Sequence, residues 1–173
     1  MYYHQDNLKY EKQYSFFQYF YLVFIITFIG LRPIGDNGFT DSPMYIQWIE
    51  NARDGNFQEK DLGFNLLIYI SSFFNYQFIF LLCSFLTFFL LYLISKKINE
   101  KHWFIFFVST IASLYFWNHI AFSIRQGLGA VIFIYALFNK TTFKYLLFLV
   151  SISIHKSYLL PSLAYIFAIL YIN

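Results

Sequence analysis

Residues 117–129, which read WNHIAFSIRQGLG, form a polar interruption between two strongly apolar segments. The interruption contains Arg125, whose guanidinium keeps its charge at any physiological pH. At membrane depth such a charge needs a protein partner, a water-filled cavity or an anionic ligand. Gln126 adds a second polar group, and the small residues Gly127 and Gly129 allow a neighbouring helix to approach closely. This stretch therefore predicts a helix pair that surrounds a polar site.

The composition predicts an integral membrane protein. Hydrophobic residues make up 59% of the 173 residues and charged residues only 12%, whereas a soluble domain is about 45–50% apolar and about 25% charged. The formal net charge of +3, with no basic run, argues against a nucleic-acid partner. Cys83 is the single cysteine, so we expect a small packed apolar group rather than an internal disulfide. The first apolar run lacks a small-x-small cleavage site, which indicates a retained anchor.

Apolar segments of membrane-spanning character recur along the chain. We expect a single membrane domain over residues 1–173, an all-α polytopic transmembrane helix bundle with about six spans. The expected spans cover residues 14–31, 76–95, 103–117, 124–138, 143–154 and 158–171. The apolar segment 62–74 is short for a span, which favours a re-entrant or interfacial segment.

Residues 32–61 form the longest polar segment, and we expect them to be an extracytoplasmic loop. Ser42 and Pro43 start a short helix in the middle of this loop. Met44, Trp48 and Ile49 follow at helical spacing. The pattern indicates an amphipathic helix that lies along the membrane surface.

The positions of the lysines predict the orientation through the positive-inside rule. If the N-terminus is cytoplasmic and residues 62–74 do not cross, seven of the twelve basic residues lie in short cytoplasmic loops: Lys9, Lys12, Lys96, Lys97, Lys101, Lys140 and Lys144. The loop 32–61 and the polar groups around Arg125 and His155 then share the extracytoplasmic face. A site on that face has no direct access to cytoplasmic nucleotides.

Two arginines are candidates for anion binding. Arg125 either extends its guanidinium to lipid headgroups as an anchor or is fixed inside the bundle, where its planar donor fork suits a phosphate or carboxylate. Asn118 and Gln126 lie close by in sequence and favour the second alternative. Arg32 follows the first span and faces the same choice, because the glycine-rich turn after it could aim backbone N–H groups at an anion.

His155 is the candidate general base, since a neutral imidazole can take the proton of a sugar hydroxyl. The alternative is a purely structural histidine. Asp41 and Asp61 are the loop acids that we expect to bind substrate, and simple solvation is the alternative for both. No carboxylate pair at a recognisable spacing supports glycosidase chemistry. No metal-ligand cluster and no nucleotide or dinucleotide motif occurs, so we expect neither a metal nor a cofactor.

Four ordered motifs resemble those of the EpsG family. They are GLRP at residues 30–33 with TDS at 40–42 and YI at 45–46, DLGF at 61–64, Asn118 with IRQ at 124–126, and SIHKS at 153–157. Together they extend from Gly30 to about Leu160. Lys156 departs from the pattern, which has a small or apolar residue at that position. We expect the chain to correspond to an N-terminal part of such a protein or to a short member.

The resemblance implies a bacterial inner-membrane enzyme, similar to Wzy-like O-antigen and exopolysaccharide polymerases. Such an enzyme joins oligosaccharide repeat units carried on undecaprenyl diphosphate at the outer face of the membrane. Arg125 and Arg32 would neutralise the departing diphosphate, Gln126 and Asn118 would position substrate, and His155 would be the base. Membrane lipids, and a flippase and a chain-length regulator of the same pathway, are the expected partners.

Two other functions stay open. A lipid-linked-sugar glycosyltransferase would add single sugars, and its loss would give incomplete repeat units, whereas loss of a polymerase leaves single complete units to accumulate. A non-enzymatic transporter, assembly subunit or inactive truncated remnant is the other alternative. A transporter predicts inverted repeats or broken helices at the bilayer midplane.

Overall fold

The computed structural model describes residues 2–33, 41–56, 61–113, 116–117 and 123–172. Within these ranges the chain is helical and contains no strand, which confirms the all-α class. The elements are α1 (Tyr2–Gly30), α2 (Ser42–Arg53), α3 (Leu62–Ser72), α4 (Gln77–Ile98), α5 (Trp103–Ile111), α7 (Ile124–Leu137), α8 (Phe143–Ile154), the 3₁₀ helix η2 (Lys156–Tyr158) and α9 (Leu159–Ile172).

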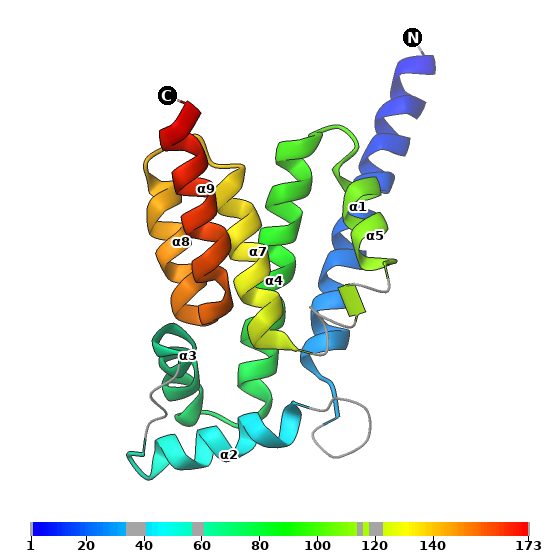
Figure 1. Ribbon diagram of the computed structural model, residues 1–173. Coiled ribbons are helices and arrows are strands. Elements are labelled where there is room, and N and C mark those ends of the chain that lie inside the picture. Colours follow the sequence, from blue (N-terminus) through cyan, green and yellow to red (C-terminus); the bar gives the residue numbers. More distant parts are fainter. Residues whose placement is uncertain (1, 34–40, 57–60, 114–115, 118–122, 173) are drawn as a thin grey trace.

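The long helices form a bundle, and α2 lies across one end of it (Figure 1). Helix α4 contacts α1, α5 and α7, and α7 contacts α8. The short helix α3 lies between α2 and the nearer end of α8, and it contacts both. Both chain termini lie at the end of the bundle opposite α2. An even number of traverses between the two ends therefore separates the termini.

Arg53 fastens α2 to the end of α3. Its guanidinium donates hydrogen bonds to the carbonyls of Ser72 and Phe74 at 3.0 and 2.7 Å and to the Tyr76 hydroxyl at 3.1 Å. These carbonyls belong to the last turn of α3 and the following turn, where helix geometry leaves them without intrahelical donors. Gly55 ends the α2 region with φ of 78°, a conformation that suits glycine. The corner that carries α3 is thus held by a charged side chain.

Two apolar cores meet along α4. The first joins α1, α4, α5 and α7 and contains Leu22, Ile25, Ile29, Phe88, Leu91, Ile94, Trp103, Phe107, Ile111, Phe116 and Val131. The second joins α2, α3, α4, α7 and α8 and contains Tyr45, Ile49, Ala52, Phe64, Ile68, Ile79, Phe80, Cys83, Ile124, Leu128, Ile132 and Ile154. Cys83 is fully buried there, as expected for a small apolar residue. The second core encloses the region where the predicted site residues lie.

Differences in helix length determine how far the site lies from the end of the bundle that carries α2. Within the described residues, α4, with 22 residues, is the single helix long and apolar enough to cross a membrane by length and composition. At 1.5 Å per residue it is about 33 Å long, whereas α7, α8 and α9 are about 18–21 Å long. The first residue of α7, Ile124, lines the same cavity as Cys83 of α4. Helix α7 therefore begins inward from the first residue of α4, Gln77.

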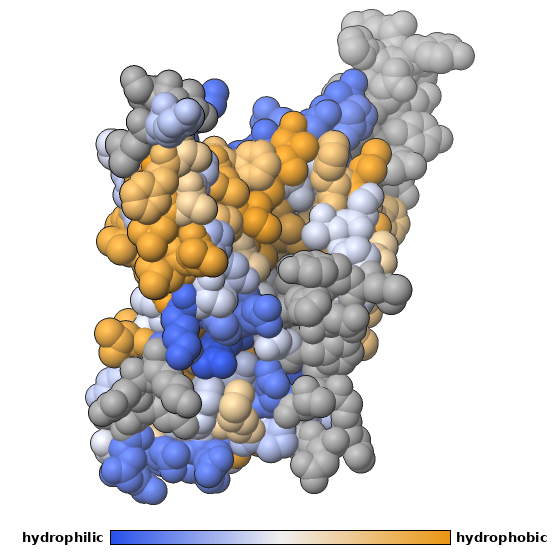
Figure 2. Space-filling model, viewed as in Figure 1, coloured by the Kyte–Doolittle hydropathy of each residue, from blue (hydrophilic) through white to orange (hydrophobic). Residues whose placement is uncertain are grey.

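Apolar side chains cover the outer surface of α8 and α9. Leu149, Leu160 and Phe167 are 63%, 77% and 66% exposed. Figure 2 shows this hydrophobic surface and, directly below it, a hydrophilic patch at the level where α8 ends and α9 begins. Soluble monomers seldom expose apolar surface on this scale, so the surface fits contact with lipid.

Candidate functional site

Three helix ends meet below the hydrophobic surface. Asp61 is the residue before α3, Arg125 lies in the first turn of α7, and His155 is the residue after α8. The first turn of α3 lies so close to the last turn of α8 that a Cβ added at Gly63 would collide with the hydroxyl of Ser153. Glycine at this position allows the two helix ends to touch. The arrangement brings polar residues from distant parts of the chain to one junction.

An ion pair joins α3 to α7 at the junction. Nη1 of Arg125 lies 2.5 Å from Oδ2 of Asp61, across 64 residues of sequence. The Asp61 side chain is only 6% exposed and the Arg125 side chain 23%. Pairing satisfies a carboxylate that would otherwise be buried at high cost. Arg125 is therefore fixed inside the protein, although part of its surface still faces outward.

The second carboxylate oxygen of Asp61 holds η2. Oδ1 accepts the backbone N–H of Lys156 at 3.2 Å. The Lys156 side chain is exposed, so this position contributes its main-chain N–H rather than its ammonium. This geometry explains how a lysine is accommodated where the motif has a smaller residue. Asp61 thus links the starts of α3, α7 and η2.

The amphipathic helix α2 supplies an aromatic wall for the guanidinium. Cζ of Arg125 lies 5.3 Å from the ring centroid of Trp48, within the range of a cation–π contact. Trp48 itself packs against Tyr45 and Phe64. A guanidinium carries five N–H donors, and Asp61 engages Nη1. Arg125 is therefore oriented on two sides and can direct other donors toward a ligand.

Asp41 lies at the start of α7 as well. Its Oδ2 accepts hydrogen bonds from the Ser123 hydroxyl at 2.8 Å and from the Tyr45 hydroxyl at 3.4 Å. Ser123 is the N-cap residue of α7, where a negative charge is favoured by the helix dipole. Burial raises the pKa of Tyr45 well above its usual value, and Asp41 raises it further. The positive end of α7 is thus approached by two carboxylates of the protein itself, those of Asp41 and Asp61.

His155 is held by the turn that follows it. Its Nδ1 lies 2.7 Å from the Ser157 hydroxyl oxygen and accepts the Ser157 backbone N–H at 3.3 Å. Burial lowers the pKa of His155, Arg125 and Lys156 lower it further, and Asp61 partly opposes them. A lowered pKa favours the neutral imidazole, the form that a general base requires. The hydroxyl of Tyr158 donates to the Gln126 carbonyl at 3.1 Å and joins η2 to α7.

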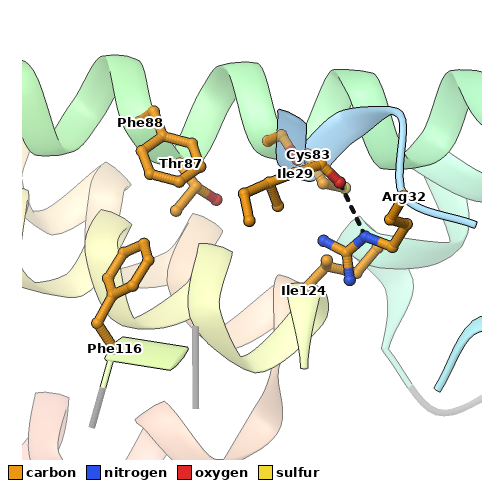
Figure 3. Close-up of a pocket in the computed structure, with 8 residues that line it drawn as sticks. Ile29, Arg32, Cys83, Thr87, Phe88, Phe116 and Ile124 are labelled. Atoms are coloured by element: carbon orange, nitrogen blue, oxygen red, sulfur yellow. Dashed lines mark hydrogen bonds between the residues drawn. The ribbon is translucent and has the colours of Figure 1, made fainter. Parts of the chain in front are cut away.

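Arg32 lies in a separate corner between α1, α4 and α7. It is 2% exposed, and its Nε donates to the Ile29 carbonyl at 3.0 Å. Its Cζ lies 5.3 Å from the ring centroid of Phe80. Figure 3 shows the guanidinium turned toward Ile124 and the neighbouring cavity. Burial lowers the pKa of Arg32 to about 10, although Tyr45, Cys83 and Asp41 oppose this effect.

The cavity beside Arg32 has a volume of about 10 Å³, which is room for about one water molecule. It is lined by Ile29, Arg32, Cys83, Ser84, Thr87, Phe88, Phe116 and Ile124. The Gln77 amide donates to the carbonyls of Gly30 and Arg32 at 2.6 and 3.1 Å and closes the end of α1. This cavity is too small to admit a diphosphate or a sugar. Arg32 also lines a second, more open pocket of about 350 Å³, together with Phe24, Thr27, Phe28, Leu31 and Pro33.

The structure thus separates the predicted site residues into groups. Arg125, Asp61 and His155 surround one junction, Asp41 lies at the same end of α7, and Gln126 contributes its carbonyl to the junction. Arg32 lies apart, and Asn118 is outside the described residues. Four further participants were not singled out from the sequence as site residues, namely Tyr45, Trp48, Ser123 and Ser157. Among the described residues, no group of three or more His, Cys, Asp or Glu side chains is placed to hold a metal ion.

Comparison with known proteins agrees with the motifs. The sequence model of the EpsG family matches residues 15–173, which is nearly the whole chain. No curated protein and no solved structure matches the chain.

Proposed function

Because the chain belongs to the EpsG family, whose members are membrane proteins with a polysaccharide-polymerase type of function, we propose that it polymerises oligosaccharide repeat units carried on undecaprenyl diphosphate. The observation that carries this proposal is the recessed junction of Asp61, Arg125 and the Lys156 main-chain N–H. The junction combines a fixed guanidinium with a neutral imidazole nearby. Glycosyl transfer from a lipid diphosphate needs both of these groups.

In the proposed reaction, a hydroxyl of the incoming repeat unit attacks the anomeric carbon of the growing chain. The bond from that carbon to the lipid diphosphate breaks, and the diphosphate leaves with the electron pair. Arg125 stabilises the negative charge that develops on the leaving group. Asp61 keeps the guanidinium in place, and His155 accepts the proton of the attacking hydroxyl.

The depth of the junction supports a lipid-linked substrate. The start of α7 lies inward from the start of α4, and α3, α8 and α9 carry exposed apolar side chains. A polyprenyl chain in the lipid phase would approach laterally along these helices. Its diphosphate would then reach Arg125 although the site does not extend through the full depth of the membrane.

We propose six crossings, with both termini cytoplasmic and α2 at the outer face. The end of the bundle that holds both termini also carries Lys96 and Lys97 in the last turn of α4, and the turn between α7 and α8 holds Lys140. Single cysteines at positions 125 and 155, in a background without Cys83, test this topology. Labelling by an impermeant reagent only from the cytoplasmic side would overturn it.

The role of Arg32 as a direct substrate ligand stays a prediction. In this structure its guanidinium is enclosed in the corner between α1, α4 and α7. We propose instead that its charge acts over a distance. Asp41 and Tyr45 interact with it electrostatically, so Arg32 adds positive charge near the start of α7.

Complementation of a polymerase-null strain tests the proposed function. We expect wild-type protein to restore long polysaccharide and Arg125→Ala to leave single repeat units on the lipid. Lys101→Ala, an exposed charge change outside the junction, is the matched control. Full-length polysaccharide from Arg125→Ala at normal expression would show that the assigned role is wrong. Incomplete repeat units would instead indicate a transferase that adds single sugars.

One observation favours a transporter as a second candidate. The ends of α3 and α8 meet at the polar junction, and half-helix ends form substrate sites in many transporters. Purified protein in liposomes distinguishes the two functions. Polymerisation of lipid-linked units without an ion gradient supports the enzyme, whereas movement of the units across the bilayer without any new glycosidic bond supports the transporter.

A further inference from the structure

The hydrogen bonds of His155 determine which ring nitrogen is basic. The backbone N–H of Ser157 reaches Nδ1 at 3.3 Å. A backbone N–H can only donate, so Nδ1 is the acceptor and carries no proton. In the neutral imidazole the proton is then on Nε2. The basic lone pair of His155 therefore points at Ser157.

The Ser157 hydroxyl occupies the approach to that lone pair. Its oxygen lies 2.7 Å from Nδ1, and since Nδ1 is an acceptor, the hydroxyl donates its proton to the ring. Ser157 is exposed, whereas His155 is half-buried. A hydroxyl oxygen has lone pairs left to accept another proton. A substrate hydroxyl can therefore use the basicity of His155 through Ser157.

We propose that Ser157 is a catalytic residue that relays the proton of the acceptor sugar hydroxyl to Nδ1 of His155. As the acceptor oxygen bonds to the anomeric carbon, its proton passes to Ser157 Oγ and the proton of Ser157 passes to Nδ1. The bond between the anomeric carbon and the diphosphate breaks, and its electron pair leaves with the diphosphate. The imidazolium later returns its proton to water. The inference rests on the proposed polymerase function.

The charges around His155 fit a transient imidazolium. Arg125, Asp61 and Lys156 are the charged groups that act on the ring. Asp61 favours the imidazolium, whereas Arg125 and Lys156 oppose it. Because Arg125 also attracts the departing diphosphate, the new negative charge of the leaving group offsets this opposition during the reaction. The relay therefore becomes favourable at the moment when the leaving group departs.

Kinetics of the purified full chain in liposomes, with a synthetic lipid-diphosphate repeat unit, test the relay. We expect Ser157→Ala to lower kcat by about 10²-fold, the usual lower limit of general-base effects, with little change in KM. Ser157→Thr keeps the hydroxyl and should stay within about tenfold of wild type. Ser153→Ala is the matched control, because its hydroxyl donates to the Val150 carbonyl rather than to an imidazole. We expect its kcat to equal that of wild type.

The double variant His155→Gln with Ser157→Ala separates a relay from a merely structural role. Groups that act as one unit show non-additive losses, so we expect the double variant to lose no more than the worse single variant. Wild-type kcat in Ser157→Ala, or equal losses in the Ala and Thr variants, would overturn the relay. Additive losses would do the same. Failure of the wild-type chain to polymerise would instead reject the proposed function.

Discussion

Arg32 and Arg125 lie toward the same end of the bundle, yet their surroundings differ. Arg125 pairs with Asp61, contacts the face of Trp48 and keeps a side-chain exposure of 23%. Arg32 is 2% exposed, donates to the Ile29 carbonyl and packs over Phe80. A charged residue in an apolar chain can therefore serve either a ligand or the fold. Packing, rather than charge, distinguishes the two roles.

The partner of each arginine explains the difference. A carboxylate compensates the charge of Arg125 but leaves its side chain 23% exposed, so a diphosphate can compete for its donors. Arg32 instead joins the end of α1 to α4 through a carbonyl and an aromatic face. Burial lowers the pKa of Arg32 to about 10, against the opposing effects of Tyr45, Cys83 and Asp41.

Equal substitutions at the two arginines should give the largest contrast. We expect Arg125→Met to lower the rate of polymerisation by about 10²–10³, the range for loss of one electrostatic stabiliser. Arg32→Met keeps the volume of a buried side chain, so we expect a loss of less than about tenfold. Initial rates in liposomes at matched protein content measure both. Equal losses would mean that Arg32 also contacts the substrate.

Asp61 should matter for stability as much as for activity. Asp61→Ala leaves the Arg125 charge without its carboxylate and the Lys156 N–H without its acceptor. Loss of one partner of a buried pair destabilises by about 3 kcal/mol. Asp61→Asn keeps an acceptor for the N–H and should cost less. Denaturant unfolding in detergent gives both values.

A double-mutant cycle of Asp61→Ala and Arg125→Ala isolates the contribution of the ion pair to stability. If the pair is the source of the effect, the double variant should be less destabilised than the sum of the single variants. Strict additivity would show that the ion pair contributes nothing beyond its separate side chains.

The sequence predicted the class of the fold and much of the membership of the site, but not its pairings. Apolar segments that begin near Leu62, Ile124 and Phe143 coincide with the starts of α3, α7 and α8. The sequence makes Asp61 a candidate for substrate binding and Arg125 a candidate for catalysis through anion binding. Their ion pair spans 64 residues and depends on how α3 packs beneath α8. Neither periodicity nor composition contains that information.

The inward orientation of the Arg32 side chain could not be predicted from the sequence either. Its position after an apolar run is compatible with a side chain that faces lipid, water or protein, and only the packing of α4 and α7 decides among them. Trp48 was assigned to the apolar face of α2, whose docking on the bundle brings the ring to Arg125. The role of Asn118 stays a prediction, because it is outside the described residues.

Gly129 offers a way to shift the junction without removing any of its polar groups. A Cβ there would lie 2.7 Å from Cε2 of Tyr158 and 3.3 Å from Cβ of His155. We expect Gly129→Ala to displace η2 at a cost of about 1–3 kcal/mol, as for other overpacked sites. Lower kcat should accompany this loss, because His155 moves relative to Arg125. Adding Tyr158→Leu should recover part of the stability, and no recovery would exclude the collision as the cause.

The smallest expected effect is the pH dependence of the junction. Burial, and then Arg125, lower the pKa of His155 below its ordinary value of 6.5. The folded protein therefore binds this proton less readily than the unfolded chain. The resulting stability is complete above about pH 6.5 and is lost as pH falls through the folded pKa. The acid limb of kcat/KM should likewise lie below pH 6.5. Arg32, with a pKa of about 10, does not titrate in this range. The acid limb therefore reports on the junction that contains Arg125 and His155. His155→Gln should remove that limb, and a limb that persists would assign the titration to another group.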